Sequence, residues 1–298
     1  MAATTVVERV ERLNRASLRR VVEPDVDLPG EVGPGQVIAD ELLSVAGLDL
    51  DLTPEQRAVL SREEVASMLD AGIRFEAILE AGFALQIAQA DDITDARITY
   101  LCHEMGEETR HQRMFQRVVR ELGPQARNPL AQSWLLNRAD RLVSGWLIRH
   151  RAAFYVMVLA GEEIPDLLQK LASEHPDTDP FLAEVNRYHR QEEARHLSFA
   201  RAMLPELWAK AGRIERAVVR HLLPVGIRQM FEFMVHPGVY EVVGLDGWGT
   251  WKAVNATPER QAIRHEATRP VLEALQAAGV VSKRRPPTAW RRLVGDLT

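Results

Sequence analysis

Residues 107–111 read Glu-Glu-Thr-Arg-His, and residues 192–196 read Glu-Glu-Ala-Arg-His. A helix turns by about 100° per residue, so side chains three positions apart project from the same face. In each stretch the second glutamate and the histidine have this spacing and can bind one metal ion together. The duplication therefore predicts two metal-binding helices, with the pairs Glu108 and His111, and Glu193 and His196.

Two glutamates upstream complete this pattern. Glu76 precedes Glu108 by 32 residues, and Glu162 precedes Glu193 by 31. Bundles that hold two metal ions on carboxylates draw one further glutamate from each of two other helices. Two helix hairpins related by a pseudo-twofold axis would produce nearly equal spacings, which predicts an all-α fold with a ferritin-like four-helix bundle core. The spacing favours Glu162 over its neighbour Glu163 but does not separate them decisively.

His189 supplies a third imidazole. It stands four residues before Glu193 and seven before His196, and the three side chains fall within about 60° of one another on a helix. We expect it to join the second pair and make the two sites unequal. Carboxylates with one or two imidazoles suit iron or manganese better than zinc. The single cysteine, Cys102, excludes a thiolate zinc cluster.

The duplicated motif has to be weighed against an ordinary explanation. A single Glu-x-x-His is common on solvated helix faces, and the acids and arginines beside it can form i,i+4 surface pairs. Two copies with matching upstream glutamates favour the metal site instead. Under the ordinary explanation, Glu104, Arg110, Glu192 and Arg195 could form such pairs, and Glu80 and Glu163 could support a ligand or lie on the surface. The histidines without ligand spacing are assigned structural roles; they are His103, His150, His175, His221, His236 and His265.

Hydrophobic periodicity predicts helices along most of the chain. Cap patterns at residues 53–56 and 61–64 predict one short and one long helix start, and Pro165 predicts a kink beside Glu162. Residues 236–249 are expected to form a loop. The predicted helices cover residues 6–20, 63–89, 93–122, 129–142, 144–172, 179–203 and 258–278.

We expect one domain, residues 1–298. Residues 1–50 would form an N-terminal helix and connector, residues 61–204 the metal-binding bundle, and residues 205–298 accessory helices and a tail or packing arm. The additional N- and C-terminal helices would surround the bundle core.

The composition is that of an ordinary globular protein, with 298 residues, 46% hydrophobic positions and a formal net charge of −5. No basic cluster precedes Lys283-Arg284-Arg285, so nucleic acid is not expected as a partner. The first residues lack the charged and apolar regions of a secretory signal. Apolar stretches fall short of the roughly 20 residues that cross a bilayer. A cytoplasmic protein without membrane association is expected.

Over most of residues 8–200, the chain resembles the p-aminobenzoate N-oxygenase family of non-haem diiron enzymes. The likeness lies in residues 11–20, 52–57, 60–63, 75–79 and 189–196. The resemblance implies a ligand set of Glu76, Glu108, His111, Glu162, His189, Glu193 and His196, in which Glu108 and Glu193 bridge. Family members often carry aspartate where this chain has Glu107 and Glu192. If these acids hold the ligand histidines, the longer side chain changes that geometry.

This resemblance implies an oxygenase that activates dioxygen on two iron ions, with manganese as a substitute metal. The expected reaction oxidises a small-molecule amine, in the first place an arylamine, to a hydroxylamine or nitro product. Electrons would come from an external reductase or reductant, because no flavin, nicotinamide or cysteine-cluster signature is present. A homodimer is compatible with such a bundle. Substrate-binding residues do not carry over.

Three alternatives stay open. A diiron hydroxylase would act on carbon, a ferritin-like protein would bind iron without turnover, and a plain helical bundle would bind no metal. His189 argues against storage, because a storage site needs labile oxygen ligands. Aromatic and methionine side chains near the ligands could line a substrate pocket, although at helical spacing such residues are more often core; they are Phe75, Phe83, Met105, Phe115, Phe154, Met157 and Phe199.

Overall fold

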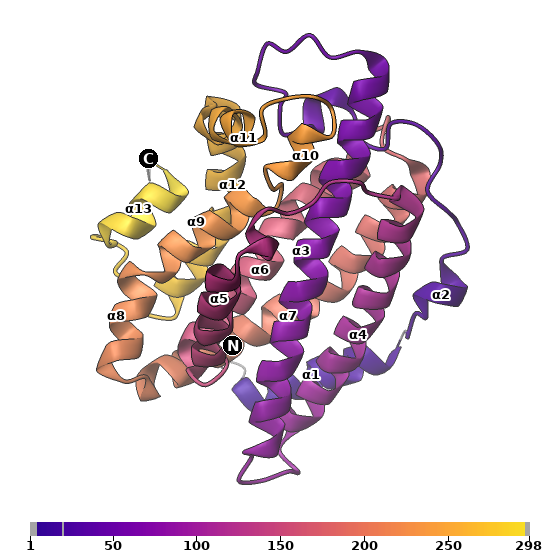
Figure 1. The fold of residues 1–298 in the computed structure, drawn as a ribbon. Coiled ribbons are helices and arrows are strands. Elements are labelled where there is room, and N and C mark those ends of the chain that lie inside the picture. The colour runs from indigo at the N-terminus through magenta and orange to yellow at the C-terminus, as the bar shows by residue number, and fades with distance from the viewer. Residues whose placement is uncertain (1–4, 20, 296–298) are drawn as a thin grey trace.

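The computed structural model describes residues 5–19 and 21–295. Four long helices run side by side at its centre (Figure 1): α3 (Pro54–Ala88), α4 (Ala96–Leu122), α6 (Arg151–Glu174) and α7 (Pro180–Lys210). The most extensive packing pairs α3 with α4 and α6 with α7. No strand occurs in the part of the chain that the structure describes. The predicted all-α bundle is confirmed.

Shorter helices surround this bundle. On the N-terminal side, α1 (Val6–Arg19) packs on α4 and α7. On the C-terminal side, α12 (Pro258–Ala277) packs on α6, and α13 (Thr288–Val294) packs on α12. The remaining elements are α2 (Pro24–Asp27), η1 (Asp40–Leu42), η2 (Leu130–Gln132), α5 (Trp134–Leu147), α8 (Arg213–His221), α9 (Leu223–Phe233), α10 (Gly238–Glu241) and α11 (Gly247–Ala256).

Local sequence signals start and stop the central helices. The hydroxyl of Thr53 accepts the amide N–H of Gln56, and the Gln56 side chain accepts the amide N–H of Thr53, which forms a capping box at the start of α3. Asp95 caps α4 through the amide N–H of Arg97. At the other end, Gly123 adopts φ 62°, a left-handed conformation that ends a helix at little cost in glycine.

Three predicted features of the secondary structure are wrong. Ser61 does not start a second helix, because α3 runs through it and its hydroxyl instead accepts the amide N–H of Val37. α7 continues through Pro205 to Lys210; proline lacks the N–H of a helical hydrogen bond, but burial of Leu204 and Leu207 on either side stabilises the helix there. Residues 236–249 are not one loop, because they contain α10 and the start of α11.

The C-terminal segment is a packing element, one of the two roles considered for it. Trp290 of α13 is fully buried, and its indole N–H donates to the carbonyl of Val219 at 3.1 Å. An aromatic ring with its polar atom satisfied in this way contributes a large buried area. None of the described helices combines the length and the apolar character needed to span a membrane.

Close packing of α3 on α6 depends on Gly82. A Cβ at this position would lie 2.3 Å from Cε2 of Phe154, whose ring is buried. We expect Gly82→Ala to lower the free energy of unfolding by about 1–3 kcal/mol, since the overpacked ring must move within a dense core. Chemical denaturation measures the change. Gly226→Ala, on an exposed face with open space around it, is the matched control and should cause no loss of stability.

Candidate metal centre

The seven predicted ligands come from all four central helices. α3 carries Glu76, α6 carries Glu162, α4 carries one Glu-x-x-His pair, and α7 carries the other pair together with His189. All seven side chains are buried, with at most 3% of their surface exposed. Burial of so many titratable groups is costly unless they are paired or coordinate a cation.

Two glutamates occupy the centre of this group. Glu108 lies 3.4 Å from Nδ1 of His111 through Oε2, and 3.3 Å from Nδ1 of His196 through Oε1. Glu193 lies 3.2 Å from Nδ1 of His111 through Oε1, and 2.9 Å from Nδ1 of His196 through Oε2. Each carboxylate therefore spans the two imidazoles, one oxygen towards each. This is the placement that two bridging ligands require.

His189 lies next to Glu193 of the predicted pair, at 3.3 Å from Nε2 to Oε1, but it faces Glu76 and His111 and not His196. Its Nε2 lies 3.4 Å from Oε1 of Glu76, and its ring centroid lies 4.5 Å from that of His111. Glu76, His111 and His189 each offer one ligand atom within 4.8 Å of the others. The prediction considered only the direction of the side chain around α7. Seven residues also separate His189 from His196 by about 10.5 Å along the helix axis, and His189 groups with Glu76 and His111 instead.

The choice between Glu162 and Glu163 follows from their surroundings. Glu163 is paired with Arg201. Glu162 is buried, its Oε1 has no hydrogen-bond partner, and burial followed by the charge of Glu193 raises its pKa well above the usual range. The geometry thus favours Glu162 as a ligand.

The glutamates that precede the two pairs hold histidines on opposite helices. Nε2 of His111 on α4 lies 3.1 Å from Glu192 of α7, and Nε2 of His196 on α7 lies 2.8 Å from Glu107 of α4. A carboxylate only accepts hydrogen bonds, so in each ring Nε2 carries the proton and Nδ1 is left to bind a metal. Glu192 is therefore not the surface acid that the ordinary explanation allowed, since only 4% of its surface is exposed.

Two further side chains stabilise these outer glutamates. Tyr188 donates its hydroxyl to Glu192 at 2.8 Å. Arg195 lies 2.9 Å from Glu107 and 3.1 Å from Glu192, so one guanidinium ties the two acids together. Although burial acts in the opposite direction, the hydrogen bond with His111 helps to bring the pKa of Glu192 down to about 2. Both outer acids are therefore held as acceptors.

Glu192→Gln tests this orienting role. We expect metal affinity to fall by about 10–100-fold, because partners that orient a metal-binding histidine typically have effects of this size. Competition with a chromophoric chelator measures the affinity. Glu184→Gln, exposed on the same helix, is the matched control. An unchanged dissociation constant in Glu192→Gln would show that His111 needs no such support.

Glu104 lies beside the predicted ligands and is not the surface acid that the ordinary explanation allowed. It is 1% exposed, both carboxylate oxygens lack hydrogen-bond partners, and burial raises its pKa to about 8. It groups with Glu108 and His196 as a candidate to hold a metal ion. The signal that could have found it is its spacing of four residues before Glu108, which puts both acids on one face of α4.

The unsatisfied atoms fit bound cations. Burial, and then the charge of Glu108, raises the pKa of Glu76 well above its usual range, while burial lowers the pKa of His189 to about 3 and leaves a neutral imidazole. The buried atoms without a hydrogen-bond partner include Glu76 Oε2, Glu104 Oε1 and Oε2, Glu108 Oε1, Glu162 Oε1, His189 Nε2 and Glu193 Oε1. Carboxylate oxygens and neutral imidazole nitrogens are the donors that iron or manganese accepts.

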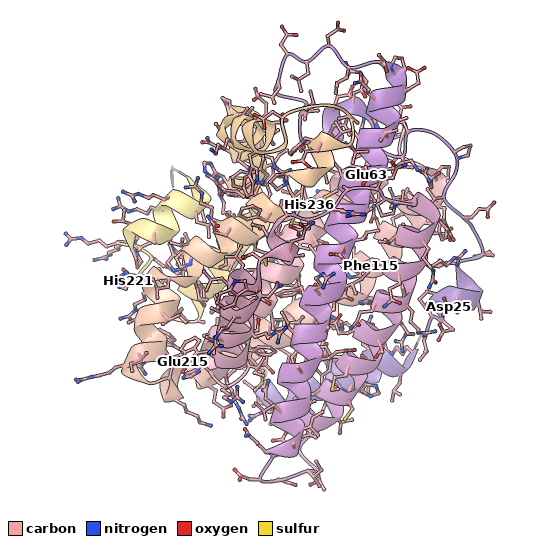
Figure 2. The ribbon with its side chains drawn as sticks, in the orientation of Figure 1. Asp25, Glu63, Phe115, Glu215, His221 and His236 are labelled. Atoms are coloured by element: carbon pink, nitrogen blue, oxygen red, sulfur yellow. The ribbon has the colours of Figure 1, made fainter. Side chains whose placement is uncertain are left out.

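Other residues singled out in the sequence lie elsewhere or have mixed roles. Phe115, in the interior between α3 and α4 (Figure 2), packs against His189 with ring centroids 4.8 Å apart. Phe115 and Phe75 line a cavity beside the ligands, whereas Phe154 is packed in the core. His221 lies far from the centre, on α8. Among the described residues, the histidines assigned structural roles join no candidate metal group.

Comparison with known proteins agrees with this architecture. The family model described as "P-aminobenzoate N-oxygenase AurF" matches residues 3–279, nearly the whole chain. Uncharacterized proteins of Mycobacterium bovis and of two Mycobacterium tuberculosis strains are 28% identical over 243 residues. The match covers 78% of this chain and 70% of each relative.

Proposed function

The chain belongs to the p-aminobenzoate N-oxygenase AurF family, and from this premise we propose that it is a diiron monooxygenase that oxidises an amine nitrogen. The family suggests the diiron oxygenase class. The specific reaction proposed is the conversion of an arylamine to a hydroxylamine or nitro product. The observation that carries the proposal is the placement of Glu108 and Glu193, each of which faces both His111 and His196.

Seven side chains would hold the two irons, with Glu104 as a further candidate. Glu76, His111 and His189 would serve one ion, Glu162 and His196 the other, and the two central glutamates both ions. Iron, when bound, supplies the redox chemistry by which dioxygen is activated. Manganese would fit the same donors.

The protein's own part is to fix these donors before the metal arrives. Glu192 and Glu107 keep the protons of His111 and His196 on Nε2, so that Nδ1 of each ring faces the centre. Gln169 lies 2.8 Å from Nδ1 of His189, which leaves Nε2 of that ring towards Glu76. Preorganised donors of this kind do not need to reorient when the metal binds.

A substrate would approach through the cavity beside the ligands. Glu76, Glu162 and His189 line a cavity of about 570 Å³ whose surface is otherwise rich in leucine and methionine. An apolar cavity that ends on reactive groups suits a small organic molecule. Electrons would come from an external reductase or reductant. A homodimer stays a prediction; exposed apolar side chains on α5, among them Trp134 and Leu142, would suit such a contact.

The test is a single-turnover reaction. The protein is reconstituted with Fe(II), reduced and mixed with dioxygen and a panel of arylamines, and the products are separated by mass. We expect oxygen-dependent hydroxylamine or nitro products, with label from ¹⁸O₂ on nitrogen. Products hydroxylated on carbon would establish the hydroxylase alternative. Stoichiometric iron without any oxygen-dependent product from a broad amine panel would leave an iron-binding protein without turnover.

A further inference from the structure

The cavity beside the metal ligands extends far from them. Along α3, its lining includes Glu76, beside the ligands, and Glu64, closer to the start of the helix. These residues are twelve positions apart in one helix, a rise of about 18 Å. The volume of about 570 Å³ is nearly four times the roughly 150 Å³ of an engineered cavity that takes one benzene ring. A molecule that fills this space is longer than a single aromatic ring.

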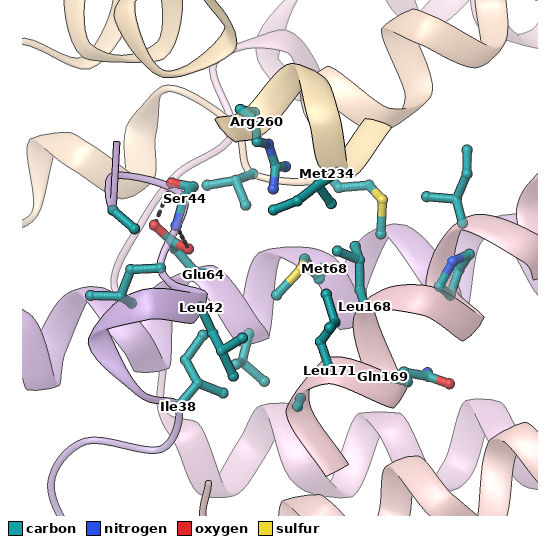
Figure 3. A pocket seen from close by; sticks show the side chains of 18 of the residues that line it. Ile38, Leu42, Ser44, Glu64, Met68, Leu168, Gln169, Leu171, Met234 and Arg260 are labelled. Carbon is teal, nitrogen blue, oxygen red and sulfur yellow. Dashed lines mark hydrogen bonds between the residues drawn. The ribbon is translucent and has the colours of Figure 1, made fainter. Parts of the chain in front are cut away.

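Arg260 of α12 lies in the lining, near Glu64, as a buried cation that makes no ion pair with a described residue; the charges of Glu64 and Glu232 act on it only from a longer distance. Only 7% of its surface is exposed, and its Nε has no hydrogen-bond partner. Its guanidinium carbon lies 4.3 Å from the centre of the Phe231 ring, a contact that leaves the guanidinium N–H groups without an acceptor among the described residues. Figure 3 shows the side chain reaching into the cavity towards Met234 and Met68. A buried guanidinium left unpaired is costly, and an anion would offset that cost.

The nearby acid does not supply this anion. Glu64 points to Ser44, whose hydroxyl and amide nitrogen lie 2.5 and 2.8 Å from its two oxygens. No ion pair joins Glu64 to Arg260 in the described part of the chain. Arg57, also in the lining, is already paired with Asp40 at 3.3 Å. Among the described residues of the lining, Arg260 is therefore the guanidinium to which an anionic ligand can bind.

We propose that the cavity binds an elongated monocarboxylate, with the carboxylate on Arg260 and the oxidisable group beside Glu76, Glu162 and His189. The inference rests on the proposed function and adds the class of substrate. A planar guanidinium matches a carboxylate through two parallel hydrogen bonds. A dianionic phosphate would leave one charge uncompensated among apolar side chains. Between the ends, Met68, Leu168 and Met234 suit an apolar body.

The experiment measures binding to the iron-loaded protein without oxygen, so that no turnover occurs. The probes are para-aminobenzoate and anilines that carry a para-linked butanoate or octanoate chain, each prepared also as primary amide and phosphonate. We expect the octanoate to bind at least about 10-fold more tightly than its own amide, because a hydrogen bond to a charged group contributes roughly that much. It should exceed para-aminobenzoate by a similar factor, because a single ring is too short to join the metal ligands to Arg260. Equal affinities across chain lengths, or between acid and amide, would overturn the proposal. A preference for the phosphonate would overturn the choice of carboxylate.

Variants locate the anchor. Arg260→Gln should remove the preference for acid over amide, Arg260→Lys should keep part of it, and Arg269→Gln, exposed on the same helix, should leave it unchanged. An acid preference that survives Arg260→Gln would place the anchor elsewhere. The ligand series on the unaltered protein decides the substrate class even if a variant does not fold. Tight binding of the long acid without N-oxidised product would count against the proposed reaction alone.

Discussion

Glu193→Ala is expected to abolish high-affinity binding of both metal ions and to reduce oxygen-dependent turnover by more than about 100-fold. Glu193 contacts the nitrogens of all three histidines of the centre, at 3.2 Å for His111, 3.3 Å for His189 and 2.9 Å for His196. Loss of a shared carboxylate should exceed the 10–100-fold effect typical of an outer partner. Iron per chain after anaerobic reconstitution and single-turnover product yield are the two measurements.

The control separates metal loss from unfolding. Glu184→Ala removes an exposed carboxylate from the same helix and should keep full iron and turnover. Circular dichroism checks that Glu193→Ala remains helical. If a folded Glu193→Ala protein retained stoichiometric iron with unchanged turnover, Glu193 would not be a shared ligand.

The second large effect is on stability, in Glu64→Gln. Burial raises the pKa of Glu64 to about 7 in the folded protein from an ordinary value of 4.5, against the opposing hydrogen bonds from Ser44. Between pH 4.5 and about 7, the Glu64 carboxyl is therefore protonated in the folded protein and ionised in the unfolded chain. The free energy of unfolding therefore falls as the pH rises from 4.5 to about 7, by about 3 kcal/mol in all.

Glutamine has the same shape but does not titrate, so the variant escapes this loss. We expect Glu64→Gln and the unaltered protein to differ little near pH 4.5, and the variant to be relatively more stable above pH 7. Chemical denaturation at a series of pH values measures the difference in free energy of unfolding. Glu184→Gln should show no such trend. A constant difference between Glu64→Gln and the unaltered protein at all pH values would mean that Glu64 titrates normally.

Much of the fold was predictable because its signals are local. The capping box at Thr53, the start of α7 after Asp179 and the stop at Gly123 depend on residues within one helical turn. The errors came where packing prevails over local preference. Ser61 is a good cap by type, yet it lies inside α3 because its hydroxyl is used by Val37. Pro205 is tolerated inside α7 because Leu204 and Leu207, on either side of it, pack in the core.

The sequence by itself determined the all-α bundle, the two Glu-x-x-His pairs and the upstream Glu76 and Glu162. Helical periodicity fixes how residues of one helix face each other, and equal spacing relates the two hairpins. Only the tertiary structure decided that His189 faces Glu76 and that Glu104 is buried with the centre. These contacts depend on how far neighbouring helices are shifted along their axes.

Two further features also needed the tertiary structure. The hydrogen bonds that orient the histidines join residues more than 80 positions apart, Glu192 with His111 and Glu107 with His196. The unpaired Arg260 reaches the cavity from a helix outside the bundle. No periodicity within a helix encodes which distant side chain it meets, because that depends on how the helices pack against one another. Sequence therefore identified the candidate donors of this centre, and packing decided which of them meet, what orients them and what a substrate would encounter.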